Sequence, residues 1–146
     1  MRVMVLVKAT KDSEAGAAAS TQLLADMGSF NEALSDAGVM EAGEGLHPSS
    51  RGLRVRLAGA ERTVVPGPFA ATQELVSGFW IWKVATMDEA IAWALRIPSV
   101  DGAPAEVELR PILEAEDFGP EFTPELREQE ERLRARAETS LKRSGR

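Results

Sequence analysis

The 146-residue sequence contains no cysteine and only one histidine, His47. Without cysteine the chain cannot form disulfides, thiolate nucleophiles or Cys-based metal sites. A single histidine also excludes a multi-histidine metal site within one chain. No phosphate-loop or dinucleotide fingerprint surrounds the glycines of the sequence. We therefore expect neither a metal nor a cofactor.

Basic residues and long hydrophobic runs are also scarce. The formal net charge is -6 and the pI is near 4.9, which argues against a nucleic-acid or anionic membrane partner, because phosphates require clustered Lys and Arg. No stretch approaches the roughly 20 apolar residues of a membrane helix. The apolar run within Met1–Lys8 is too short for a signal segment. We expect a cytoplasmic protein without nucleic-acid or membrane partners.

The composition that remains, 44% hydrophobic and 27% charged, is typical of a globular domain. Alternating apolar residues predict strands, and apolar residues at helical spacing predict two helices. The predicted strands are Met1–Lys8, Val39–Gly45, Leu53–Leu57, Thr63–Val65, Leu75–Val84 and Glu106–Arg110. The helices are predicted to run from a cap at Ser20 or Thr21 to Gly38, and from a cap at Thr86 to before Pro98, the second with Ile91, Ala94 and Leu95 on one stripe. Thr10–Ser20 and Leu46–Ser50 are predicted to be loops.

The order of these elements, β-α-β-β-(β)-α-β, predicts an α+β fold, a ferredoxin-like split βαβ sandwich with an antiparallel sheet. Its two helices cover one face of the sheet. The first strand nevertheless carries valines on one face and Met4 and Leu6 on the other, and Leu75–Val84 likewise has two apolar faces. Leaving the second face in water would cost several kcal/mol, so we expect a homodimer that pairs two sheets.

The C-terminal segment differs in composition. We expect a domain over residues 1–122, followed by a charged helix and tail over 123–146, with Thr123 as the cap and Pro124 in the first turn. Leu126, Leu133, Ala137 and Leu141 form a thin apolar stripe among many Glu and Arg residues. A solvated helix laced with ion pairs is the favoured interpretation, and an arm that packs on the partner subunit is the alternative.

Several short motifs occur in order along the chain: Glu44–Ser50, Pro66–Glu74, Gly78–Trp80 and Glu114–Gly119. Together they resemble the YCII-related, DGPF-type proteins. The resemblance implies a dimeric α+β barrel of ferredoxin-like protomers. It further implies a possible enzymatic pocket with a histidine–aspartate pair, and genes beside those of extracytoplasmic-function sigma factors.

The sequence departs from that family in its most characteristic loop, which reads Asp-Gly-Pro-Phe-Ala-Glu-Thr-Lys-Glu in the family. Pro66 replaces the aspartate, Ala71 the glutamate and Gln73 the lysine, so Glu74 is the carboxylate that remains. An acid or base supplied by those three positions is therefore absent from this chain.

His47 is the first candidate for proton transfer, because its ordinary pKa lies near neutral, and Glu44 or Glu41 could orient it. The alternative is a loop histidine bonded to nearby backbone. Arg54 and Arg56 share a strand face and could clamp an anion, unless they pair with Glu106, Glu108 or Arg110 across strands. Ser49 and Glu74 complete the predicted ligand contacts. Trp80, Trp82 and Phe79 are interpreted as side chains of the dimer interface, with core side chains and pocket walls as the alternatives.

These observations favour a protein that binds a small, possibly anionic molecule in a pocket between paired sheets, with cofactor-free acid–base catalysis left open. A non-catalytic regulatory module, linked to a sigma factor system, is the alternative. A purely structural dimer is the third hypothesis.

Overall fold

The computed structural model describes residues 1–70, 73–99 and 104–145. Two compact units divide the chain, Met1–Ile112 and Leu113–Arg146. The first unit contains, in chain order, β1 (Arg2–Lys8), α1 (Lys11–Glu14), α2 (Thr21–Asp36), β2 (Met40–Gly45), a 3-10 turn (Ser49–Arg51), β3 (Leu53–Ala58), β4 (Glu61–Pro66), β5 (Val76–Lys83), α3 (Met87–Ala94) and β6 (Val107–Pro111).

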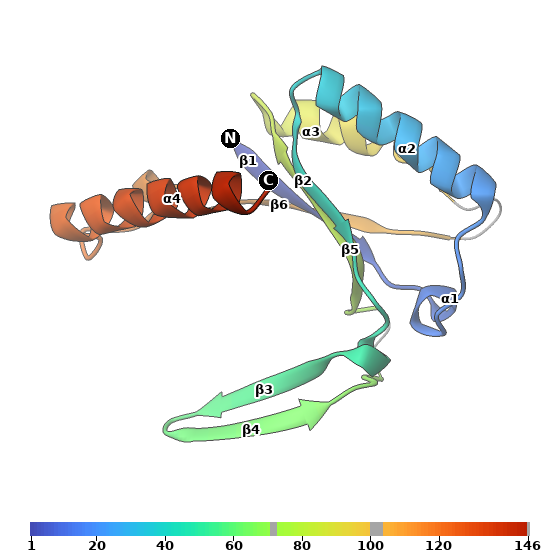
Figure 1. Cartoon of the computed structure of the whole chain (residues 1–146), viewed down its shortest axis with the longest axis horizontal. Coiled ribbons are helices and arrows are strands. Elements are labelled where there is room, and N and C mark those ends of the chain that lie inside the picture. The colour runs from blue at the N-terminus through green and yellow to red at the C-terminus, as the bar shows by residue number, and fades with distance from the viewer. Residues whose placement is uncertain (71–72, 100–103, 146) are drawn as a thin grey trace. The chain divides into compact units, whose positions relative to one another are not determined.

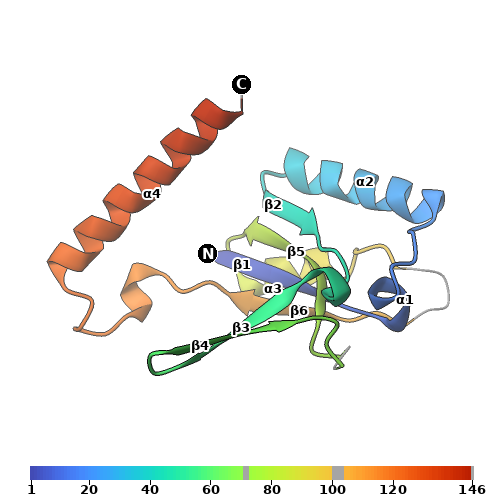
Figure 2. The ribbon, with the colours of Figure 1, turned by 60° about the horizontal axis from the view of Figure 1, so that its bottom comes forward.

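The main sheet of the first unit has the strand order β2-β5-β1-β6, and each neighbouring pair is antiparallel. Among the described residues, the strands β3 and β4 pair only with each other. They form a separate hairpin that follows β2 and precedes β5 in the sequence. When this hairpin is set aside, the order is β-α-β-β-α-β with the first strand inside the sheet. The predicted ferredoxin-like α+β fold is confirmed (Figures 1 and 2).

Helix α2 begins and ends where the sequence predicts. The Ser20 hydroxyl accepts a hydrogen bond from the Leu23 N–H at 3.1 Å, and Gly38 takes a positive φ of 68° after the last turn. The predicted loop before it is partly wrong, because Lys11–Glu14 is a short helix. Reciprocal hydrogen bonds between Thr10 and Ser13 close that helix at its start.

The core lies between the helices and one face of the sheet. Val3 and Val5 on β1 and Trp82 on β5 are fully buried, and the ring of Phe30 meets the rings of Trp80 and Trp82 edge-on. This is the face on which the sequence places the two tryptophans and the valines. Trp80 and Trp82 are buried within one chain, so the favoured interpretation of them as interface side chains is wrong and the core alternative holds.

Helix α3 is capped by Thr86 as predicted, but its predicted apolar stripe is right only at Ala94, which packs half-buried against the core. Ile91 and Leu95 are exposed, whereas Ala90 is completely buried. The ring of Trp93 packs edge-on against Phe30 at 6.3 Å between centroids. Because the largest side chain of the helix makes this contact, the helix is rotated so that Ala90, and not Ile91, faces the sheet.

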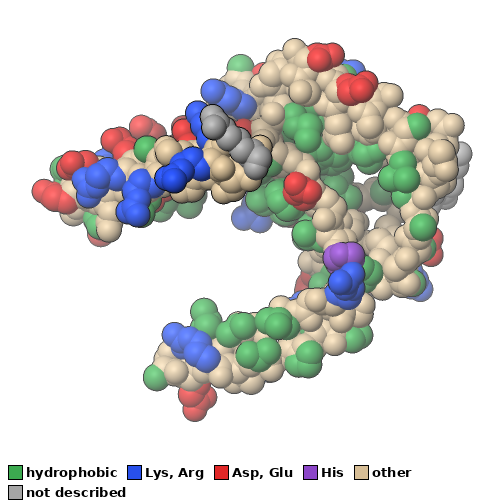
Figure 3. Space-filling model, viewed as in Figure 1, with side chains coloured by type: hydrophobic (Ala, Val, Ile, Leu, Met, Phe, Trp, Pro, Cys, Tyr) green, Lys and Arg blue, Asp and Glu red, His purple; other side chains and the backbone are tan. Residues whose placement is uncertain are grey.

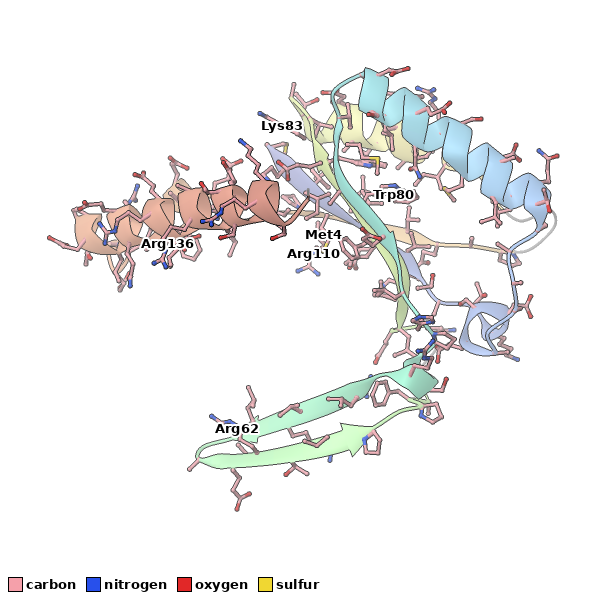
Figure 4. The ribbon with its side chains drawn as sticks, viewed as in Figure 1. Met4, Arg62, Trp80, Lys83, Arg110 and Arg136 are labelled. Carbon is pink, nitrogen blue, oxygen red and sulfur yellow. The ribbon has the colours of Figure 1, made fainter. Side chains whose placement is uncertain are left out.

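Among the described residues of the first unit, no helix lies on the other face of the main sheet, and we call it the free face. Two rows of side chains cross it from edge to edge: Ala42, Ile81, Met4 and Arg110, then Glu44, Phe79, Leu6 and Glu108. Figure 4 shows Met4 and Arg110 on the side of the sheet opposite Trp80. The middle of the free face is thus apolar and its margins are charged.

The second unit consists of a 3-10 turn (Ala115–Asp117) and α4 (Pro124–Ser144). Thr123 caps α4, and two ion pairs, Glu128–Arg132 and Glu130–Arg134, follow its surface at 2.9 Å. These i, i+4 pairs match the favoured interpretation of a helix laced with ion pairs. Within the described ranges, no helix has the length and apolar character that crossing a membrane requires.

Candidate functional site

A pocket of about 540 Å³ lies within the first unit, on the helical side of the sheet. Side chains of α2, including Leu23 and Met27, form one wall, and the ends of β2 and β5 form another. The segment after α1 and the loop from Leu46 to Pro48 close its sides. In Figure 3 the single purple side chain, the histidine, lies at the edge of this hollow. The pocket is therefore formed by one chain alone.

Glycine at position 43 makes room for the indole that forms part of the pocket wall. A Cβ atom on Gly43 would lie 2.6 Å from Cδ1 of Trp80, closer than side chains can approach. The absence of a side chain on Gly43 therefore lets Trp80 lie flat against β2 between the strand and α2.

Asn31 places a polar group in this otherwise apolar wall. The Trp80 indole N–H donates a hydrogen bond to Asn31 Oδ1 at 2.9 Å, and both residues line the pocket. An indole nitrogen can only donate, so the amide oxygen must face it and the NH₂ group must point elsewhere. Among the described residues this NH₂ group has no hydrogen-bond partner. It is a donor available to a bound molecule.

The sequence analysis did not select Asn31, although a signal for it exists. It follows Leu23 and Met27 at intervals of four residues, on the apolar stripe of α2. A polar residue on the buried stripe of a helix requires a partner, and that requirement singles out Asn31 from the other polar residues of α2.

His47 lines the pocket and is exposed at its edge. Arg51 Nη1 lies 3.2 Å from Nδ1 and 3.1 Å from Nε2 of the ring. An atom equally close to both nitrogens cannot lie in the ring plane, because Cε1 stands between them. The guanidinium therefore stacks on the imidazole face, and both ring nitrogens keep their in-plane positions for other partners.

Glu44 borders the pocket, but its side chain belongs to the other face of the sheet. Gly43 faces Trp80, and strand alternation puts Glu44 opposite Phe79 on the free face. Within the described residues no hydrogen bond joins Glu44 to His47. Glu41, the other predicted partner, pairs with Arg2 at 2.7 Å. The predicted role of Glu44 beside His47 stays a prediction.

Ser49 connects three segments. Its hydroxyl donates to the Glu14 carboxylate of α1 and accepts from the Phe69 N–H at 3.0 Å, while its own N–H donates to Glu14 at 3.0 Å. The hydroxyl proton is thus already engaged, and Ser49 is not among the residues that line the pocket. Its evident task is to hold the loop after β4 against α1.

The two arginines of β3 lie outside the pocket. The guanidinium of Arg54 stacks on the Phe69 ring at 3.8 Å from its centroid, and Arg56 lies opposite Thr63. The alternative in which they pair with charged residues of the last strand is wrong, because β3 and β6 belong to different sheets. Whether they contact an anion stays a prediction.

The loop that resembles the family motif is built around Gly67. A Cβ atom there would lie 1.8 Å from the Ser49 carbonyl oxygen, so only glycine fits. Pro66 ends β4 opposite Leu53, and Gln73 and Glu74 are exposed and do not line the pocket. Ala71 lies outside the described residues. Across the described ranges, no group of three His, Asp or Glu side chains is arranged to hold a metal ion.

The fold and pocket define a ferredoxin-like α+β protein with an open pocket on its helical side. A family model of the YCII-related domain matches residues 1–115, and the chain belongs to that family. The chain is also similar to an uncharacterised protein of Rhizobium meliloti (strain 1021), with 26% identity over 91 residues, which cover 62% of this chain and 73% of that protein.

Proposed function

We propose that this protein binds a small, largely apolar molecule in the pocket beside α2. The observation that carries the proposal is a pocket of about 540 Å³ that one chain forms, open to solvent on one side, with largely apolar walls and few polar groups. Pockets of roughly 300–1,000 Å³ with this kind of lining are typical of small-molecule sites. The sequence analysis expected a pocket between paired sheets; this one does not need a second sheet.

Two polar groups define what the ligand would carry. The free NH₂ of Asn31 favours a hydrogen-bond acceptor, such as a carbonyl oxygen, at the indole wall. His47 at the edge can donate or accept a proton, so proton transfer to the bound molecule would rest on His47. An anion is not part of the proposal, because Arg54 and Arg56 do not line the pocket.

Fragment binding followed by NMR tests this function. Each of the three tryptophans gives its own indole N–H resonance, and Trp80 lines the pocket whereas Trp93 does not. Apolar fragments should move the Trp80 resonance and leave that of Trp93 in place. Fragments with a carbonyl should lose about 10-fold in affinity in Asn31→Leu, the effect of one lost hydrogen bond, while fragments without an acceptor should not.

Two neighbouring alanines supply a matched control. Ala19 lines the pocket and Ala18 does not, and both are exposed. Ala19→Phe should block the fragments and Ala18→Phe should not. The proposal is contradicted if no fragment moves the Trp80 resonance, or if Ala19→Phe leaves binding unchanged.

We also infer that two copies of the chain pair through the free face. Met4, Leu6, Phe79 and Ile81 form a continuous apolar middle there, and apolar surface of this kind favours association. Sedimentation velocity with two matched substitutions tests this pairing. Ile81→Lys changes the free face and should give a monomer, whereas Ile91→Lys changes the exposed side of α3 and should not. A wild-type chain that stays monomeric at high concentration would contradict the pairing.

A further inference from the structure

The hairpin Leu53–Pro66, here called the arm, has an apolar surface that pairs with no other strand among the described residues of the first unit. Its register places five apolar side chains on one face: Leu53, Val55 and Leu57 from β3, with Val64 and Pro66 from β4. Arg62, opposite Leu57, ends this face at the tip, where its guanidinium donates to the carbonyls of Gly59 and Glu61. Leu53, Val55, Leu57 and Val64 are 50% to 70% exposed. Figure 3 shows hydrophobic side chains gathered along this hairpin.

A two-stranded hairpin alone is at best marginally stable in water and needs packing on one face. Both of its strands also present unpaired backbone groups at their outer edges. The arm is nevertheless regular from Leu53 to Pro66, with six consecutive cross-strand pairs. A covering surface would supply the packing that the arm lacks.

The base of the arm is held by specific contacts, so the arm is not a loose loop. The Gly67 N–H donates to the Gly52 carbonyl at 3.0 Å and joins its two ends. Ser49 ties the following segment to α1, and Arg54 stacks on Phe69 beside the base. From this base the arm projects on the side of the sheet opposite α2 (Figures 1 and 2).

We propose that the arm packs its apolar face on a second copy of this chain. The inference rests on the pairing proposed above, because a copy that covers the free face lies on the side to which the arm projects. Charge favours the same occupant. The arm carries three arginines and one glutamate, so an arm of net charge +2 faces a remainder of net charge -8 in a chain of -6.

Two substitutions that add the same charge to opposite faces of the arm test this inference. Leu57 lies on the apolar face, and Thr63 lies opposite Arg56 on the other face. Sedimentation equilibrium should show that Leu57→Glu weakens association by about 10-fold or more, because it buries a charge in place of a leucine. Thr63→Glu should change it by less than about 3-fold, as expected for a rim position.

A third variant removes the arm. Since Gly52 and Gly67 are hydrogen-bonded, two glycines can replace Leu53–Pro66 without disturbing the ends. This variant should keep the circular dichroism of the core and associate as weakly as Leu57→Glu.

The outcomes separate the two proposals. If all three variants associate like the wild type, the arm inference is overturned and pairing through the free face stands. If the wild type is a monomer throughout, both are overturned. If the chain is a monomer and the arm amides still resist hydrogen exchange, the arm packs on another segment of its own chain. That result also overturns the inference. None of these results bears on fragment binding in the pocket.

Discussion

The pair β1–β5 and the pair β3–β4 both carry a row of apolar side chains on one face, but these rows have opposite environments. Val3 and Val5 are completely buried under the helices, whereas Val55 is half exposed and Leu57 is 70% exposed. Both pairs are antiparallel, and the β1–β5 register shifts only between Val7 and Lys8. The difference teaches that alternation specifies a strand and its two faces, while what covers those faces depends on neighbours distant in the sequence.

A pair of leucine substitutions should show the largest contrast between these regions. Leu34 is fully buried against the main sheet, and Leu57 is on the arm. Leu34→Ala should lower the free energy of unfolding by about 2–5 kcal/mol, because it leaves a cavity in the core. At a protein concentration that keeps the chain monomeric, Leu57→Ala should change it by less than about 0.5 kcal/mol. Urea unfolding followed by far-UV circular dichroism measures both, and equal losses would contradict the contrast.

The base of the arm, where Gly67 meets Ser49, joins the two regions, and substitution there should have the next largest effect on stability. Gly67→Ala brings a methyl group onto the Ser49 carbonyl oxygen and should cost about 1–3 kcal/mol through the forced shift of backbone. Gly28 lies within α2 with nothing near its absent side chain, so Gly28→Ala should instead stabilise by about 0.5–1 kcal/mol. Thermal unfolding compares the two variants. If Gly67→Ala left the thermal stability unchanged, Gly67 and the Ser49 carbonyl would not be in the close contact described here.

Removing the Ser49 hydroxyl, also at the base of the arm, should lower the stability by a smaller amount. Ser49→Ala leaves Glu14 and the Phe69 N–H without that hydroxyl and should cost about 1–2 kcal/mol. Ser50 is exposed, and Ser50→Ala should cost less than about 0.5 kcal/mol. Urea unfolding of both variants makes the comparison; a loss at Ser50 as large as that at Ser49 would mean that the hydroxyl network does not hold the arm.

Much of the fold follows from local sequence signals. Ser20 and Thr86 cap the two main helices as predicted, and β5 buries Trp80 and Trp82 on the predicted face. The rotation of α3 does not follow, because two apolar stripes overlap on that helix and only the contact between Trp93 and Phe30 selects one. The two strands of the hairpin follow from local signals, but their separation from the main sheet does not, since strand pairing is decided by partners elsewhere in the chain.

The candidate site was less predictable than the fold. His47 does line the pocket, but Glu44 turns to the other face of the sheet and Ser49 is engaged by Glu14 and Phe69. Asn31 lies on the apolar stripe of α2, which marks it as needing a partner, but only the fold shows that this partner is the Trp80 indole. Residue types can suggest proton transfer or hydrogen bonding, but the face on which each side chain lies depends on register.

Amide hydrogen exchange at two protein concentrations tests the central contrast most directly. Amides of the core strands β1 and β5 should be protected at both concentrations, because one chain completes their packing. Amides of Leu53–Pro66 should exchange quickly in dilute protein and become protected as the concentration rises and copies associate. Arm amides whose protection is the same at both concentrations would contradict the account that a second copy completes this region.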